Sequence, residues 1–155
     1  MIKILDFLSQ KAIIPTLEAT TKEDAIREMV DKLVNTGEIN DADKVINVLL
    51  EREKLGSTGI GEGVAIPHGK SDAVENVVAL FARSEKGVAF DALDGEPVYL
   101  LFLLIAPTTQ EAISSHLKVL ARVSRLLKDV YFRKALRNAE TTEEIVRIIE
   151  TEELK

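Results

Sequence analysis

Residues 98–106 read Val98-Tyr99-Leu100-Leu101-Phe102-Leu103-Leu104-Ile105-Ala106, a run that is apolar almost throughout. A strand that alternates between apolar and polar residues has one face in water, whereas a continuous apolar run is typical of a central strand covered on both faces. The run is about half as long as a membrane-spanning helix. It therefore predicts the middle strand of a sheet that lies between two layers of helices.

Helical patterns precede and follow this strand. Residues 20–23 read Thr-Thr-Lys-Glu and predict a capping box, with Glu23 reaching back, for a helix that Gly37 ends. A second helix is predicted from Asn40 or Asp41 to about residue 54. Gly56 follows it and is expected to end it.

Two more helices are predicted after residue 106. Thr108 and Glu111 have the spacing of a second capping box, and residues 141–144 (Thr-Thr-Glu-Glu) begin the last helix. The helical spacing behind Glu111 predicts an inward-facing set. That set is Ile113, Leu117, Leu120, Ala121, Ser124 and Leu127.

Shorter strands are predicted at residues 64–66 and 77–82. Pro67 cannot donate to a sheet ladder, so the first of these strands should end there or lie at an edge. Strands that alternate with helices indicate an α/β layered fold. No linker or repeat interrupts the pattern, and residues 1–155 are predicted to form a single domain.

The composition excludes several classes of protein. The chain has no Cys, which excludes disulfides, thiol catalysis and thiolate metal sites. Its formal net charge of −6 disfavours binding to nucleic acid, which depends on Lys and Arg. The first residues, Met-Ile-Lys-Ile-Leu-Asp, lack the pattern of a signal peptide, so the expected location is cytoplasmic.

His68 is the first candidate for chemistry. It follows Pro67 at a strand end and precedes Gly69, which places its imidazole at a rim that another protein can reach. A neutral imidazole nitrogen is a suitable phosphoryl acceptor, because its pKa is close to neutrality. A solvent-exposed loop histidine without a role is the alternative that the local sequence leaves open.

Four further residues are candidates for binding a phosphoryl group. His116 lies at the edge of a helical apolar stripe, where it could approach His68 or could be a partly buried histidine satisfied by a neighbour. Arg52 lies on a last helical turn, which suits any cation, but a guanidinium is also a common phosphoryl ligand. Ser57 and Thr58 follow in a glycine-rich loop and could donate hydroxyl hydrogen bonds.

Other motifs fail on spacing. Gly63 and Gly69-Lys70-Ser71 resemble a nucleotide P-loop, but five residues separate the glycines where the motif requires four. The glycines of residues 56–63 precede a strand instead of following it, so they do not match a dinucleotide fingerprint. Two histidines without an evident third ligand do not predict a metal site.

One stretch resembles a known family. It reads Glu51-Arg52-Glu53-Lys54-Leu55-Gly56-Ser57-Thr58-Gly59-Ile60-Gly61-Glu62-Gly63-Val64-Ala65-Ile66-Pro67-His68-Gly69. This stretch is similar to the signature of the fructose/mannitol-type (type 2) IIA domains of the bacterial phosphoenolpyruvate-dependent sugar phosphotransferase system. Residues 116–127 resemble the fructose-type members more than the mannitol-type ones. The resemblance covers essentially the whole chain.

The resemblance implies a three-layer α/β fold, with a mixed central sheet flanked by helices on both faces. It implies a phosphotransferase that accepts a phosphoryl group on His68 from the carrier HPr and passes it to a IIB domain during sugar uptake, with fructose as the expected sugar. Arg52 and His116 match family positions that line the active site, and the membrane component IIC is reached only indirectly. No cofactor and no metal are implied.

Two alternatives remain. A regulatory, nitrogen-type IIA protein would also carry phosphate on His68, but its phosphorylation state would control a bound partner. A structural or binding domain would never be phosphorylated, and His68 would then be dispensable. Many family members continue into IIB and IIC domains, so the chain is expected to be either a free-standing protein or one piece of a longer one.

Overall fold

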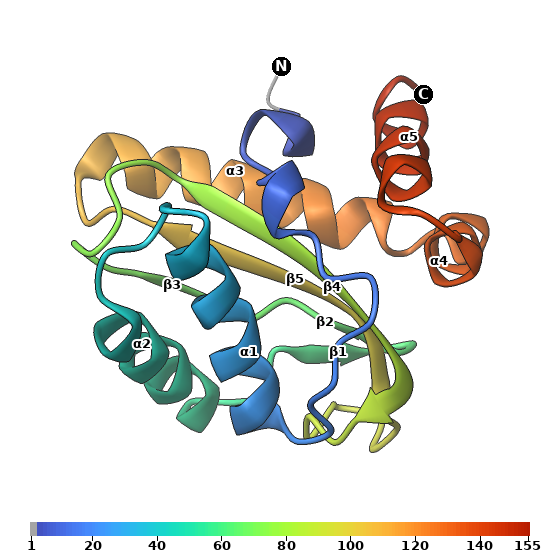
Figure 1. Ribbon diagram of the computed structural model, residues 1–155, viewed down its shortest axis with the longest axis horizontal. Helices are drawn as coiled ribbons and strands as arrows, with labels where there is room; N and C mark the ends of the chain where they lie inside the picture. The colour runs from blue at the N-terminus through green and yellow to red at the C-terminus, as the bar shows by residue number, and fades with distance from the viewer. Residues whose placement is uncertain (1–2) are drawn as a thin grey trace.

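The computed structural model describes residues 3–155 (Figure 1). Two short 3-10 helices, η1 (Ile4–Asp6) and η2 (Gln10–Ala12), precede the first α-helix. The strands are β1 (Gly59–Gly61), β2 (Val64–Ala65), β3 (His68–Lys70), β4 (Val78–Val88) and β5 (Val98–Ala106). The helices are α1 (Lys22–Asn35), α2 (Ala42–Lys54), α3 (Gln110–Leu126), α4 (Val130–Asn138) and α5 (Thr142–Glu153).

The predicted strand 98–106 is β5, and it lies in the middle of a mixed sheet. The long strand β4 pairs with it antiparallel along one edge. The other edge holds β2 and β3, which follow one another along β5 and both run parallel to it, while β1 pairs antiparallel with β2. Every residue of β5 except Tyr99 is buried, as its apolar run predicts.

Pro67 interrupts the edge of the sheet without ending it. It offers no N–H, but its carbonyl accepts a hydrogen bond from the Leu104 amide at 3.0 Å, and pairing with β5 resumes at His68. The predicted strand does end before Pro67. His68, however, is the first residue of a further strand instead of a loop residue beyond the sheet.

Helices cover both faces of the sheet (Figure 1). On one face α1 and α2 pack against alternate residues of the strands, among them Leu101, Leu103 and Ile105 of β5. On the other face α3, α4 and α5 pack against the intervening residues, including Phe102 and Leu104. Two separate apolar cores result, and the predicted three-layer α/β fold is confirmed.

The helix starts differ in detail from the predicted capping boxes. Thr21 caps α1 by accepting from the Asp24 amide, and Thr109 caps α3 by accepting from the Ala112 amide. The predicted boxes with Glu23 and with Thr108 and Glu111 are therefore wrong in register. A Thr-Thr pair offers two equivalent hydroxyls, and only the fold selects which one stands at the cap. The caps at Asp41 and Thr141 agree with prediction.

The prediction for the inward face of α3 is also wrong in part. The buried residues of this helix are His116, Val119 and Val123, whereas Leu117 is 59% exposed and Ala121 is exposed. Two apolar stripes overlap on this helix, so the spacing alone cannot choose between them. The stripe that is buried carries a histidine.

Helix α4 was not predicted, although Asp129 caps it by accepting from the amides of Tyr131 and Phe132.

Among residues 3–155, no helix has the combination of length and apolar character needed to cross a membrane.

Candidate functional site

The close contact of β3 with α2 sets the position of His68. A Cβ atom on Gly69 would lie 2.6 Å from Cγ1 of Val48 on α2, which is closer than atoms of real side chains come. Glycine therefore lets the strand approach the helix. Because side chains alternate along a strand, the imidazole of His68 lies on the opposite face from this contact, the face that α3 covers.

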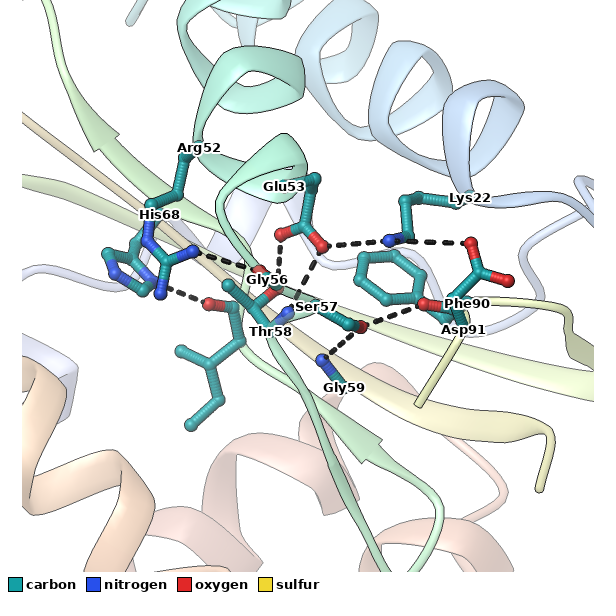
Figure 2. A network of polar contacts seen from close by, with 11 residues as sticks. Lys22, Arg52, Glu53, Gly56, Ser57, Thr58, Gly59, His68, Phe90 and Asp91 are labelled. Atoms are coloured by element: carbon teal, nitrogen blue, oxygen red, sulfur yellow. Dashed lines mark hydrogen bonds and ion pairs between the residues drawn. The ribbon is translucent and has the colours of Figure 1, made fainter. Parts of the chain in front are cut away.

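The backbone determines which nitrogen of His68 is free. Nδ1 lies 2.7 Å from the carbonyl oxygen of Ile66 (Figure 2). A carbonyl oxygen can only accept, so Nδ1 carries the proton in this hydrogen bond. In the neutral ring Nε2 then holds the lone pair and is the nucleophilic atom.

His116 is the nearest aromatic neighbour of His68 that the structure describes. The two ring centroids are 5.8 Å apart with an interplanar angle of 61°. His116 is only 3% exposed, and its Nε2 has no hydrogen-bond partner among residues 3–155. The prediction left open a histidine satisfied by a neighbour, but the structure gives Nε2 no such neighbour among residues 3–155, and a buried polar atom without a partner is uncommon.

Both rings are neutral near pH 7. Burial lowers the pKa of His68, the bond to the Ile66 carbonyl opposes that shift, and the charge of Arg52 lowers the pKa further. Burial lowers the pKa of His116 to about 4, with smaller contributions from His68 and Lys70. A neutral imidazole can attack through its unprotonated nitrogen or donate its N–H to a phosphoryl oxygen.

Two cations lie beside the pair of rings. Arg52, on the last turn of α2, lies beside His68 in Figure 2 and acts on its pKa, while its Nη1 donates to the Gly56 carbonyl at 2.9 Å. Lys70 follows His68 by two residues on β3, so both side chains lie on one face of the strand. The Lys70 charge lowers the pKa of His116. Each ring is therefore within range of one positive charge, and the Glu53 carboxylate partly opposes the effect of Arg52 at His68.

Ser57 and Thr58 are close to the site, but their hydroxyl protons are donated within the protein. The Ser57 hydroxyl donates to the Phe90 carbonyl at 2.9 Å and accepts from the Gly59 amide at 3.0 Å. The Thr58 hydroxyl donates to the carboxylate of Glu53 in a short hydrogen bond. That either side chain binds a phosphoryl group stays a prediction.

Glu53 is a residue at this site that sequence reasoning missed. It is 8% exposed, and its carboxylate accepts from the Thr58 amide at 3.1 Å and pairs with Nζ of Lys22 at 3.1 Å. Lys22 also lies 3.6 Å from Asp91 and over the ring of Phe90 (Figure 2). The carboxylate thus links α1, α2 and the glycine-rich loop.

The sequence does contain signals for the two missed residues, Glu53 and Lys70. Glu53 continues the buried stripe of Ile46 and Leu49 on α2, and a charge on such a stripe indicates a buried partner. Lys70 shares a strand face with His68. Among residues 3–155, no group of three or more His, Asp or Glu side chains is placed to hold a metal ion.

Comparisons with known proteins identify the family. Residues 6–152 match the family described as Phosphoenolpyruvate-dependent sugar phosphotransferase system, EIIA 2. The chain is 43% identical over 147 residues to a nitrogen regulatory protein of Bradyrhizobium diazoefficiens, and the match covers 94% of each chain. It is 42% identical over 147 residues to the fructose-specific EIIABC component of Bacillus subtilis, a match that covers 95% of this chain and 23% of that longer protein.

Solved structures give the same result. Nitrogen regulatory protein IIA-Ntr from Neisseria meningitidis matches with a TM-score of 0.85 at 33% identity, covering 93% of this chain and 97% of that one. A chain in the complex of enzyme IIAMTL and phosphorylated enzyme IIBMTL from Escherichia coli matches with a TM-score of 0.77 at 25% identity, covering 92% of this chain and 96% of that one. The chain therefore belongs to the EIIA 2 family of the phosphoenolpyruvate-dependent sugar phosphotransferase system.

Proposed function

We propose that this chain is a phosphoryl carrier that accepts a phosphoryl group from phospho-HPr on His68 and passes it to a IIB domain during sugar uptake, with fructose as the favoured sugar. One observation carries the proposal. The Ile66 carbonyl holds Nδ1 of His68, which leaves Nε2 as the nucleophile beside the buried ring of His116, whose own Nε2 has no partner in the described part of the chain.

The transfer needs no cofactor in this proposal. The lone pair on Nε2 of His68 forms the new N–P bond, and the electron pair of the breaking N–P bond returns to the phosphohistidine of the donor. The proton stays on Nδ1, and its hydrogen bond to the Ile66 carbonyl stabilises the positive charge that the ring acquires. Transfer to the IIB domain reverses these steps.

The surrounding residues would stabilise the phosphoryl group electrostatically. Phosphoryl transfer through a loose transition state depends on positioning and on stabilising charge more than on acid–base catalysis. Arg52 and Lys70 supply positive charge, and in the tautomer that carries its proton on Nε2, His116 can donate to a phosphoryl oxygen. Ser57 and Thr58 are proposed as phosphoryl ligands only if their hydroxyls leave the Phe90 carbonyl and the Glu53 carboxylate, the bonds that hold the loop in this structure.

The relatives support two roles for the same chemistry. The fructose-specific component of B. subtilis supports transport, and the IIAMTL complex with IIBMTL supports a IIB domain as the acceptor. The nitrogen regulatory protein of B. diazoefficiens supports a regulatory IIA protein as the second candidate. In both roles the reaction is expected in the cytoplasm.

The mass of the intact protein tests the carrier function. Wild type and His68→Gln are incubated with enzyme I, HPr and phosphoenolpyruvate, with phosphorylation of HPr as the control. We expect one added phosphoryl group on wild type only, and an unchanged circular dichroism spectrum for the variant. An added group on His68→Gln, or none on wild type beside phosphorylated HPr, would refute the assignment.

A second experiment separates the two roles. The phosphorylated protein is mixed with a purified fructose-type IIB domain, and loss of phosphate from this chain is measured over time. Rapid transfer to IIB is expected for the transport role. Retention of phosphate in the presence of a IIB domain that accepts it from another IIA protein would favour the regulatory role.

A further inference from the structure

A pocket of about 280 Å³ lies on the other side of β5 from His68. Its lining residues are Arg83, Ser84 and Glu85 of β4 and Lys134, Arg137 and Asn138 of α4. Arg83 pairs with Leu100 of β5, whereas His68 pairs with Leu104 on the opposite edge. Four residues along a strand span about 13 Å. The pocket is therefore separate from the phosphoryl site, and its role is independent of the proposed function.

Arg83 is a buried charge that pairs with no carboxylate in the described part of the chain. It is 8% exposed, and its guanidinium is held by carbonyl oxygens alone. Nε donates to Pro15 at 2.9 Å, and Nη1 donates to Leu136 at 2.9 Å, to Arg137 at 3.4 Å and, in a short bond, to Ala139. The carbonyls of residues 136, 137 and 139 stand at the C-terminal end of α4, where the helix dipole favours a cation, but they supply only partial negative charge. Nη2 has no acceptor among residues 3–155, so it can still bind an anion.

The other two cations of the pocket also lack a carboxylate. Within the described part of the chain, neither Lys134 nor Arg137 forms an ion pair, and neither does Glu85, the acid that lines the same pocket. The guanidinium of Arg137 stacks 3.9 Å from the centre of the Tyr99 ring. Stacking uses the face of the guanidinium and leaves its in-plane N–H groups free to donate.

The lining of the pocket is basic, whereas the chain as a whole is acidic. The chain has 26 acidic and 20 basic residues, yet this one pocket gathers Arg83, Lys134 and Arg137 around a single acid. Ser84 and Asn138 add polar groups to the same lining. Three cations that converge in a pocket with one carboxylate suit an anionic ligand.

We propose that this pocket binds a small phosphate monoester, with its dianionic group between the guanidinium groups of Arg83 and Arg137 and close to Lys134. A phosphate offers more oxygens and more charge than one carboxylate, which matches several converging donors. The volume is just below the usual range for drug-sized ligands, which suits a molecule of a few carbon atoms.

The test is titration of the full chain, labelled with ¹⁵N, with glycerol 3-phosphate. Glycerol and succinate serve as the uncharged and the dicarboxylate probes. We expect saturable shifts below about 20 mM glycerol 3-phosphate, confined to residues 83–85 and 134–138, and no saturation with glycerol or succinate. Shifts confined to residues 52–70 would place the phosphate at the His68 site and overturn the proposal.

Variants test the cations directly. The double variant Lys134→Gln/Arg137→Gln removes two exposed charges and is expected to weaken binding at least about tenfold, by analogy with other charge-assisted hydrogen bonds. Lys128→Gln, which changes an exposed charge outside the pocket, is the matched control and should bind like wild type. Equal affinity in the double variant, or saturation by succinate at the same concentration, would refute a phosphate site at this place.

Discussion

The carboxylate of Glu53 accepts hydrogen bonds from both the backbone amide and the hydroxyl of Thr58. The same carboxylate pairs with Lys22 at the start of α1. The loop that begins at Gly56 is therefore held by a buried charge on the helix before it. Arg52 donates to the carbonyl of Gly56 in this loop. By holding the loop, the Glu53 carboxylate therefore also helps to position the Arg52 guanidinium beside His68.

Glu53→Gln is expected to destabilise the fold and to slow phosphoryl acceptance. The amide keeps the size of the side chain but leaves Lys22 without its buried counter-charge. We expect a loss of about 1–3 kcal/mol in the free energy of unfolding, measured by urea denaturation. Glu51→Gln on the same helix is the matched control, because Glu51 is exposed and its loss should leave stability and rate unchanged. Equal stability of the two variants would contradict a structural role for the Glu53 carboxylate.

Arg52→Ala is expected to slow phosphoryl acceptance without abolishing it. Removing one donor that stabilises a transition state costs about a hundredfold or more in rate. Rapid-quench measurement of phosphoryl transfer from phospho-HPr gives the rate. Lys54→Ala, which removes an exposed cation on the same turn, is the control for a general effect of charge. If the two variants have equal rates, Arg52 has no specific role.

Gly69→Ala tests the close contact between β3 and α2. The added methyl group would lie 2.6 Å from Cγ1 of Val48, so strand or helix must move. Overpacking of this kind costs about 1–3 kcal/mol of stability. The double variant Gly69→Ala/Val48→Ala removes the clashing atom and should lose less stability than the sum of the two single variants. Additive losses in urea denaturation would show that the clash is relieved elsewhere.

Much of the fold could be predicted from the sequence because its signals are local. The apolar run of β5 and the caps at Asp41 and Thr141 depend on neighbouring residues only. The strand beginning at His68 could not be predicted in this way. It exists because β5 offers pairing partners on the far side of Pro67, and that contact is long-range.

The candidate site also has a part that the sequence predicts and a part that depends on long-range contacts. His68, Arg52 and His116 were identified from motif and resemblance, and the structure brings these three residues together. The hydrogen bonds of the other two predicted residues depend on the fold: the Ser57 hydroxyl donates to the Phe90 carbonyl, and the Thr58 hydroxyl donates to the Glu53 carboxylate. Phe90 lies 33 residues from Ser57 in the sequence, and no local pattern indicates that contact.

The pKa of His116 predicts how stability depends on pH. Burial lowers the pKa of this ring from an ordinary 6.5 to about 4, so the folded protein keeps the ring neutral where the unfolded chain protonates it. Below the unfolded pKa the unfolded state binds more protons, and stability falls as the pH drops from about 6.5 to about 4. The contribution of His116 is fully present above that window.

His116→Gln removes this titration and is the variant that checks it. The difference in unfolding free energy between wild type and His116→Gln is measured in urea at about pH 7 and about pH 4.5, so that the other groups, which both proteins share, are compared under the same conditions. We expect wild type to lose on the order of 2 kcal/mol more than the variant between these two values, because its buried ring stays neutral at a cost that grows with acidity. A constant difference across the range would mean that His116 titrates normally and that its ring is open to water.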